Sequence, residues 1–208
     1  MRSSHRLWCL ALSCCVLAAA TVSSCTEPAP VRNEKQTARD AYAAGYEKGR
    51  AVRESRGKGA SIAEVVWGGC TRRALDAGQL AEADRGAWVG GCLDGVSELA
   101  EDPPDGRVTV RTQEKGLLPE FLEWLGDEDD RALATHVSAI TVVELGTPGL
   151  DFDVELTTDY RPRAADRFDA EEMSAEFAEW WDGDDGDGKA QNLVVRGSHG
   201  EKIAARRL

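Results

Sequence analysis

The sequence predicts an α+β protein with two regions: a disulfide-linked helical hairpin in residues 35–100, and a small antiparallel sheet with helices packed on one face in residues 106–208. In the first region, small and apolar residues recur every three or four positions, which is the period of a helix. Two cysteines there each follow a pair of glycines. In the second region, apolar and charged residues alternate, as in a half-buried strand. A charged, proline-rich segment at 101–106 separates the two regions.

The first region contains three predicted helices. Small and apolar residues at helical steps place the first one at 38–52. The second, at 61–77, begins with a Ser-x-x-Glu sequence that is typical of a capping box. Asp84 is the expected N-cap of the third, at 85–99. The expected inward face of the second helix consists of Ile62, Val66, Cys70 and Ala74.

The two cysteines of this region are expected to form a disulfide. Cys70 lies seven residues before the expected end of the second helix, and Cys92 lies seven residues after the expected start of the third. In an antiparallel hairpin both would stand at the same height, about 10 Å from the loop. The paired glycines would let the two backbones approach closely enough for the bridge. Trp67 and Trp88, which precede the glycines, would either pack around the bridge or form a ligand surface.

In the second region the clearest signals are two strands. Residues 137–145 are rich in β-branched side chains, and residues 150–157 alternate between apolar and polar. The second strand should therefore bury its apolar side chains and expose Asp153 and Glu155 to water. The other expected elements are a short strand around Val110, helices at 117–125 and 165–181, and short strands around Leu193 and Ile203.

The first 24 residues have the layout of an export signal, with basic residues, an apolar stretch at 7–20 and then small residues. That stretch is shorter than the roughly 20 residues of a spanning helix. The Val-Ser-Ser-Cys run ending at Cys25 resembles the lipobox of bacterial lipoproteins, which more often has leucine in place of Val22. The resemblance implies that Cys25 is acylated, becomes the first residue of the mature chain and begins a short tether at 25–34. An ordinary cleavable signal is the alternative.

The number of cysteines favours the acylated form. Of the six cysteines, three leave with the signal, so acylation of Cys25 leaves one pair for a disulfide in an oxidising compartment. Without acylation an exported protein would carry one odd thiol. The expected location is therefore the extracytoplasmic face of the cell membrane, reached through a lipid anchor.

The charge of the chain disfavours two classes of partner. A formal net charge of −12 makes it a poor binder of nucleic acid or anionic lipid. We therefore expect membrane attachment to depend on the acyl chains and not on a basic patch. The composition, rich in alanine and glycine and with arginine well above lysine, resembles that of proteins from high-GC Gram-positive bacteria.

Few residues in the sequence suggest chemistry. The acidic segment 182–188 suggests calcium, but no EF-hand register places glutamate at position 12, so an acidic turn is favoured. Neither His136 nor His199 lies in a zinc-ligand spacing. No catalytic residue, metal ligand or cofactor is therefore predicted.

The sequence thus favours a non-catalytic, lipid-anchored protein that binds a protein or a cell-wall component. The alternatives are a cell-envelope enzyme built from scattered carboxylates, or a weak calcium binder. An enzyme should have a deep pocket with at least two ionisable groups of shifted pKa. A binding module should have a shallow apolar patch with a polar rim.

Overall fold

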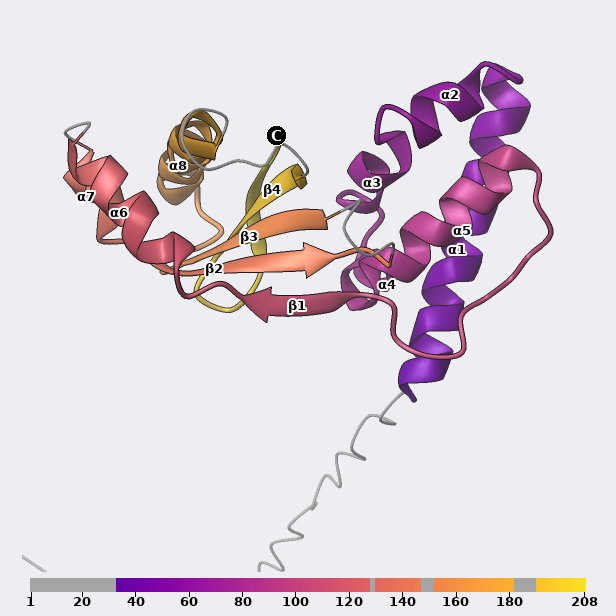
Figure 1. Ribbon diagram of the computed structural model, residues 1–208, viewed down its shortest axis with the longest axis horizontal. Helices are drawn as coiled ribbons and strands as arrows, with labels where there is room; N and C mark the ends of the chain where they lie inside the picture. Colours follow the sequence, from indigo (N-terminus) through magenta and orange to yellow (C-terminus); the bar gives the residue numbers. More distant parts are fainter. Residues whose placement is uncertain (1–32, 128–129, 147–151, 182–189) are drawn as a thin grey trace, which may run out of the picture. The chain divides into compact units, whose positions relative to one another are not determined.

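The computed structural model of the protein describes four ranges: residues 33–127, 130–146, 152–181 and 190–208 (Figure 1). Arg32–Leu208 form one compact unit. In these ranges no helix has the length and apolar character needed to cross a bilayer. The export signal, Cys25, most of the tether and the acidic segment 182–188 lie outside the described residues, so the predictions made for them stay predictions.

The helical region begins at a capped helix. The side chain of Asn33 accepts a hydrogen bond from the Lys35 backbone N–H at 3.1 Å, which starts the first helix. Asp84 caps the fifth helix in the same way, as predicted. The five helices are α1 (Glu34–Arg56), α2 (Ala60–Val65), α3 (Gly69–Ala74), α4 (Gln79–Ala83) and α5 (Arg85–Ser97).

Helices α1 and α5 pack with their backbones in contact. A Cβ atom on Gly45 would lie 1.9 Å from the carbonyl oxygen of Trp88, and one on Gly49 would lie 2.2 Å from that of Cys92. Four residues further along α1, from Gly45 to Gly49, the contact in α5 also moves four residues forward, from Trp88 to Cys92. The two helices therefore run in the same direction. Only glycine permits such an approach. The glycines of α5 that contact α1 in return are Gly91 and Gly95.

The prediction of one continuous helix over 61–77 is wrong, although the segment does pack against α5. The segment forms two short helices, α2 and α3, because Gly68 takes the left-handed conformation between them (φ 62°). The capping box is absent as well, since the Ser61 hydroxyl donates to the Lys58 carbonyl at 2.7 Å and α2 has no side-chain cap. The helix that lies along α5 is α1.

The predicted disulfide is present and links α3 to α5. Cys70 and Cys92 are fully buried, with their Cα atoms 5.8 Å apart. The role predicted for the glycines beside Cys92 is wrong. Gly91 contacts the backbone of Tyr42 in α1, and a Cβ on Gly90 would have nothing within 4 Å. The glycines of α5 therefore serve the contact with α1 and not the bridge.

Removing the bridge should destabilise the protein clearly. We expect the double variant Cys70→Ala/Cys92→Ala to lose about 3 kcal/mol of unfolding free energy, because the bridge closes a loop with a sequence separation of 22. Urea unfolding followed by tryptophan fluorescence measures this in the mature chain, residues 25–208, with Cys25→Ser, which removes its remaining thiol. The reduced parent should unfold at the same urea concentration as the double variant. Equal midpoints for the oxidised parent and the double variant would contradict the prediction.

The second region forms one sheet whose strands follow the order of the chain. Its strands are β1 (Val110–Gln113), β2 (Val137–Glu144), β3 (Phe152–Thr158), β4 (Ala190–Arg196) and β5 (Lys202–Arg207). The α+β class is confirmed, but the sheet is mixed and not purely antiparallel. Strands β3 and β4 are parallel, with Val154 opposite Leu193. The reason is that α8 (Ala164–Trp180) connects them as a crossover helix.

As predicted, the helices of this region cover one face of the sheet. Besides α8 these are α6 (Leu117–Asp127) and α7 (Arg131–Ala134), which lie together in Figure 1. The rings of Phe121 and Phe177 meet edge to face with their centroids 5.1 Å apart. The sheet side chains buried beneath these helices include Ile140, Val154, Leu156, Leu193 and Val195.

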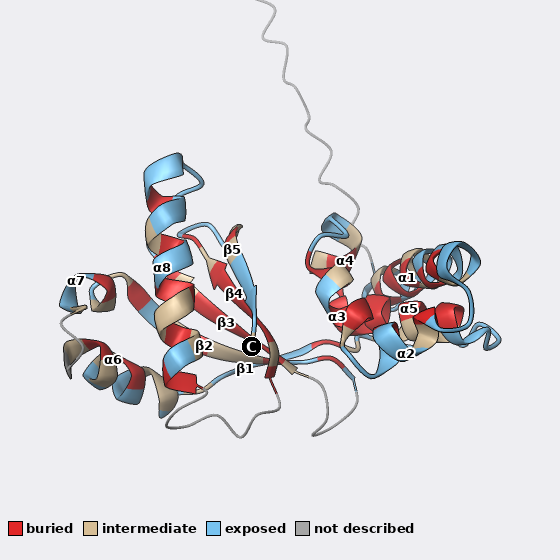
Figure 2. Ribbon diagram, turned by 90° about the horizontal axis from the view of Figure 1, so that it is seen from above, coloured by how far each residue is buried: buried red, intermediate tan, exposed pale blue. Residues whose placement is uncertain are grey.

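The opposite face of β3 does not face water, which corrects the sequence prediction. Asp153 has no exposed surface and Glu155 only 6%. Strand β3 is therefore buried on both faces, as its mainly red colour in Figure 2 indicates. A buried carboxylate requires a partner, and the partner defines the candidate site.

Candidate functional site

A buried arginine from α5 covers the two carboxylates of β3. Arg85 is fully buried; its Nη1 donates to Asp153 Oδ2 at 2.7 Å and its Nη2 donates to Glu155 Oε1 at 3.0 Å. The other oxygen of Asp153 accepts from Asn192 Nδ2 at 2.8 Å. Charge-assisted hydrogen bonds of this length offset part of the desolvation of buried ions. The helical region and the sheet are thus joined through buried charge.

Asp84 fixes the position of Arg85. Its Oδ1 accepts from the Ala87 N–H at 3.2 Å, which caps α5, and from the Thr109 N–H and hydroxyl at 2.9 and 2.7 Å. The Thr109 hydroxyl oxygen also accepts from the Gly86 N–H at 2.8 Å. Arg85 is the first residue of α5, where a cation faces the unfavourable end of the helix dipole. The carboxylates of β3 compensate for that position.

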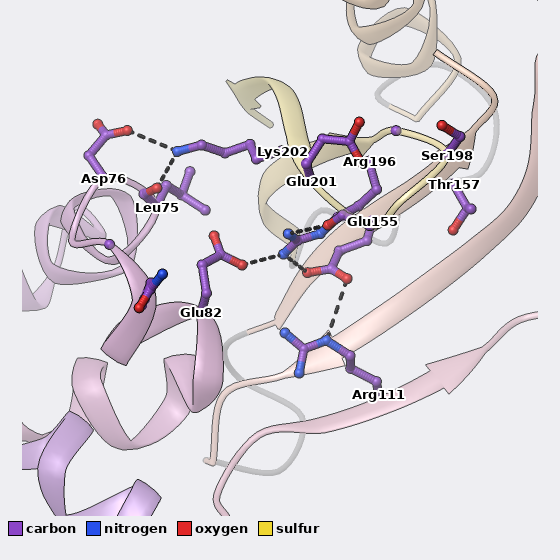
Figure 3. Close-up of a pocket in the computed structure, with 14 residues that line it drawn as sticks. Leu75, Asp76, Glu82, Arg111, Glu155, Thr157, Arg196, Ser198, Glu201 and Lys202 are labelled. Atoms are coloured by element: carbon purple, nitrogen blue, oxygen red, sulfur yellow. Dashed lines mark hydrogen bonds and ion pairs between the residues drawn. The ribbon is translucent and has the colours of Figure 1, made fainter. Parts of the chain in front are cut away.

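The charged cluster continues toward the surface. Arg196 Nη2 lies 2.8 Å from Glu155 Oε1 and 2.7 Å from Glu82 Oε2 of α4. Arg111 Nε lies 3.4 Å from Glu155 Oε2 (Figure 3). With Arg85 behind it, Glu155 is contacted by three guanidinium groups.

These surroundings shift the pKa values of Asp153 and Glu155 in opposite directions. Burial raises the pKa of Asp153 in spite of the attraction of Arg85. Burial also opposes the ionisation of Glu155, but Arg196, Arg85 and Arg111 together outweigh it and lower its pKa. For Arg196, burial favours the neutral form, yet its two carboxylate partners raise its pKa. Glu155 and Arg196 are therefore held in their charged forms.

The cluster forms the floor of an open cleft of about 980 Å³. At one end Lys202 Nζ donates to the Leu75 carbonyl and lies 3.1 Å from Asp76 Oδ1. In the cleft Arg111 contacts Glu155 through Nε, and Figure 3 draws no interaction of its two terminal nitrogens with the other residues shown. The charged residues that line the cleft are Asp76, Glu82, Glu155, Glu201, Arg111, Arg196 and Lys202.

The lowered pKa of Glu155 predicts an acid-dependent loss of stability. Its ion pairs contribute above its unfolded pKa, about 4.5, and are lost as the pH falls through the lower folded pKa. We expect Glu155→Gln to unfold about 2 kcal/mol more easily than the parent at neutral pH, because charged hydrogen bonds are lost. The difference in unfolding free energy between the parent and this variant should become smaller as the pH falls below about 4.5. Urea unfolding across this range measures it; a gap that does not change with pH would contradict the assignment.

The structure separates the two tryptophans that were predicted to form a ligand surface. Trp88 is 3% exposed and packs in the same cluster as Cys70 and Cys92, whereas Trp67 is 61% exposed. Packing around the bridge therefore describes Trp88 only. Four exposed apolar side chains form what we call the α2 surface: Ile62, Val65, Val66 and Trp67.

The two histidines lie in different surroundings. His136 Nδ1 is 2.6 Å from Asp159 Oδ1, and its ring lies 4.8 Å from that of Tyr160. The His199 backbone N–H donates to Glu201 at the turn after β4. Within the described part of the chain, the group that meets the distance requirement for metal ligands consists of Glu64, Cys70 and Cys92. Its two sulfurs are already bonded to each other.

Comparisons with protein-family models, with curated protein sequences and with solved structures find no match to this chain. The candidate site is therefore interpreted from its own geometry.

Proposed function

We propose that the protein is a lipid-anchored, extracytoplasmic binding protein that performs no reaction and holds a polar ligand or protein partner in the charged cleft. The cleft contains two ionisable groups of shifted pKa, Glu155 and Arg196, as expected for an enzyme. Both shifts favour the charged form, however, so a non-catalytic binding role is the function that the cleft supports best. The observation that carries it is Arg111, which lines the cleft and contacts Glu155 through Nε at 3.4 Å, with no interaction of its terminal nitrogens drawn among the residues of Figure 3.

The proposed location rests on the cysteines. The buried Cys70–Cys92 bridge suits an oxidising compartment. It leaves Cys25 as the one cysteine of the mature chain without a sulfur partner, and Cys25 follows the lipobox-like run. Mass spectrometry of the native protein tests this part. We expect a diacylglycerol-bearing N-terminal Cys25, and an unmodified N-terminus would refute the anchor.

The proposed binding role rests on the charge state of the cleft. Glu155 and Arg196 hold each other ionised at neutral pH, since the pKa of Glu155 is lowered and that of Arg196 is raised. A general acid or base needs a pKa near the working pH. Groups held in their charged forms instead suit recognition of a polar ligand. Such a ligand would present a carboxylate to Arg111 and hydrogen-bond donors to the acidic residues that line the cleft.

The alternative of a carboxylate-based envelope enzyme draws on one feature of the same cluster. Asp153 and Glu155 have pKa values that are pushed apart, as those of acid–base pairs often are. Asp153, however, is covered by Arg85 and has no exposed surface. This alternative therefore requires Arg85 to move before Asp153 can reach a substrate.

Site-specific photo-crosslinking in intact cells tests the binding role. A photoreactive residue at Gln79, which is exposed and lines the cleft, should yield an adduct with an envelope component. The matched control is Gln113, an exposed residue of β1 that does not line the cleft. The adduct should disappear in Arg111→Glu. Equal adducts at both positions, or no effect of the charge reversal, would contradict binding in the cleft.

A further inference from the structure

Helix α2 has its polar and apolar sides reversed. Ile62 of this helix is 60% exposed, and Val66 and Trp67, which directly follow it, are 68% and 61% exposed, while Glu64 within the helix is 2% exposed. An exposed apolar cluster of this kind marks an interaction site more often than an isolated surface residue does. Sequence periodicity predicted the opposite orientation, with Ile62 and Val66 inward.

The buried side of α2 is held by charge. Arg73 binds the carboxylate of Glu64 in a bidentate manner, with Nε and Nη2 each 2.9 Å from an oxygen. Arg56 Nη1 lies 3.5 Å from the same carboxylate. Gly69 provides the space, since a Cβ there would lie 2.3 Å from Glu64 Oε2. This arrangement fixes α2 with its apolar side chains outward.

The charge around the α2 surface is opposite to that of the whole protein. Residues 55–75 contain four basic side chains and a single acid, Glu64, whose carboxylate is bound by Arg73 and Arg56. Even with the flanking acids Glu54 and Asp76 the local charge stays positive. The rest of the chain brings the formal charge to −12. Lys58 and Arg72 are exposed on either side of α2 in the sequence. Apolar residues with a tryptophan and a basic rim suit an anionic, partly apolar occupant.

We propose that the α2 surface docks on a bilayer that contains anionic phospholipid, as a second membrane contact beside the acyl anchor. The inference deepens the proposed membrane location and rests on it for access to a bilayer. It also revises the expectation from net charge, because the local charge of residues 55–75 is positive although the whole chain is acidic.

The length of the tether allows both contacts at once. Cys25 precedes Asn33 by eight residues, and an extended chain of that length reaches at most about 28 Å. Helix α1 has 23 residues and is therefore roughly 34 Å long. In the sequence the α2 surface follows the C-terminal end of α1, and the tether precedes its N-terminal end. The acyl chains on Cys25 and the α2 surface can therefore reach the same bilayer when α1 lies inclined or flat on it.

Vesicle sedimentation tests the proposal without the lipid anchor. The mature chain with Cys25→Ser is mixed with vesicles of phosphatidylcholine alone, or with about a quarter phosphatidylglycerol. We expect binding to the anionic vesicles that weakens with added salt. Trp67→Ala and, separately, Lys58→Glu/Arg72→Glu should each reduce the partition coefficient about fivefold or more, since they remove the interfacial aromatic residue or the attracting charge.

Phe168→Ala is the matched control. Phe168 is, like Trp67, an exposed aromatic residue, with 68% of its surface accessible. It lies in α8 beside acidic residues. Its removal should leave vesicle binding unchanged. Absence of binding to both vesicle types, equal binding by the parent and Trp67→Ala, or loss of self-association instead of vesicle binding in Trp67→Ala would overturn the proposal. An unmodified native Cys25 would refute the anchor but leave this measurement valid.

Discussion

Arg85→Met should lower the free energy of unfolding by about 3–5 kcal/mol, the cost of leaving buried carboxylates without their cation. Arg85 is fully buried and contacts Asp153 at 2.7 Å and Glu155 at 3.0 Å. Methionine fills much of the same volume, so lost packing contributes less than lost charge. Urea unfolding with the disulfide intact measures the effect.

The matched control is Arg111→Met. Arg111 is part of the same cluster, but its side chain is 32% exposed and its contact with Glu155 is longer, at 3.4 Å. Exposed ion pairs contribute about 0–1 kcal/mol, so this variant should unfold close to the parent. Equal losses in the two variants would show that burial of Arg85 does not set the energetics of the cluster.

The pH dependence and a second substitution separate charge from shape. The pKa of Asp153 is raised by burial, so its contribution favours the folded state at low pH and is lost as the pH rises through that pKa. Without Arg85 this trend should steepen, and the deficit of Arg85→Met should shrink in acid. Arg85→Met/Asp153→Asn should recover about half of the loss, because no unpaired charge then remains on Asp153. A double variant no more stable than Arg85→Met would contradict this account.

The strands and helices of the second region could be predicted because their signals are local. The β-branched run at β2 and the alternation at β3 lie within single elements, and both strands form where the pattern places them. The parallel pairing of β3 with β4 has no such local signal. It depends on where α8 returns the chain, which is decided by tertiary packing.

The candidate cleft could not be predicted for a similar reason. Alternation in β3 distinguishes two faces but does not say what covers the polar one. Arg85 lies 68 residues before Asp153, and only the folded chain brings them together. One weak signal existed: an arginine directly after the N-cap Asp84, where the helix dipole disfavours a cation, suggests a nearby anion.

In the helical region the bridge was predicted correctly, but the close backbone contact of α5 was assigned to the wrong segment. Cys70 and Cys92 are bonded as predicted, but the expected close partner of α5 was the segment 61–77. The decisive pattern was Gly45-x-x-x-Gly49 in α1 matched by Gly91-x-x-x-Gly95 in α5. Small residues at four-residue spacing on two helices permit backbone contact, whatever bridge lies nearby.

Gly45→Ala should therefore be among the most damaging single-methyl additions in the chain. A Cβ there would lie 1.9 Å from the Trp88 carbonyl oxygen and 2.8 Å from its carbon, both backbone atoms that cannot turn aside. Helices α1 and α5 must separate, which disturbs the packing of Tyr42 against Trp88 and Cys92 in one buried cluster. We expect a loss of about 3 kcal/mol from overpacking, larger than the roughly 1 kcal/mol that alanine contributes through helix propensity.

Gly90→Ala provides the control within the contacting helix. A Cβ on Gly90 would have nothing within 4 Å, although its neighbour Gly91 lies against Tyr42. The same chemical change should then raise stability by about 0.5–1 kcal/mol, since alanine is the better helix former. Thermal unfolding of the two variants should thus shift in opposite directions from the parent. Shifts in the same direction would mean that glycine at position 45 is retained for reasons other than contact between the two backbones.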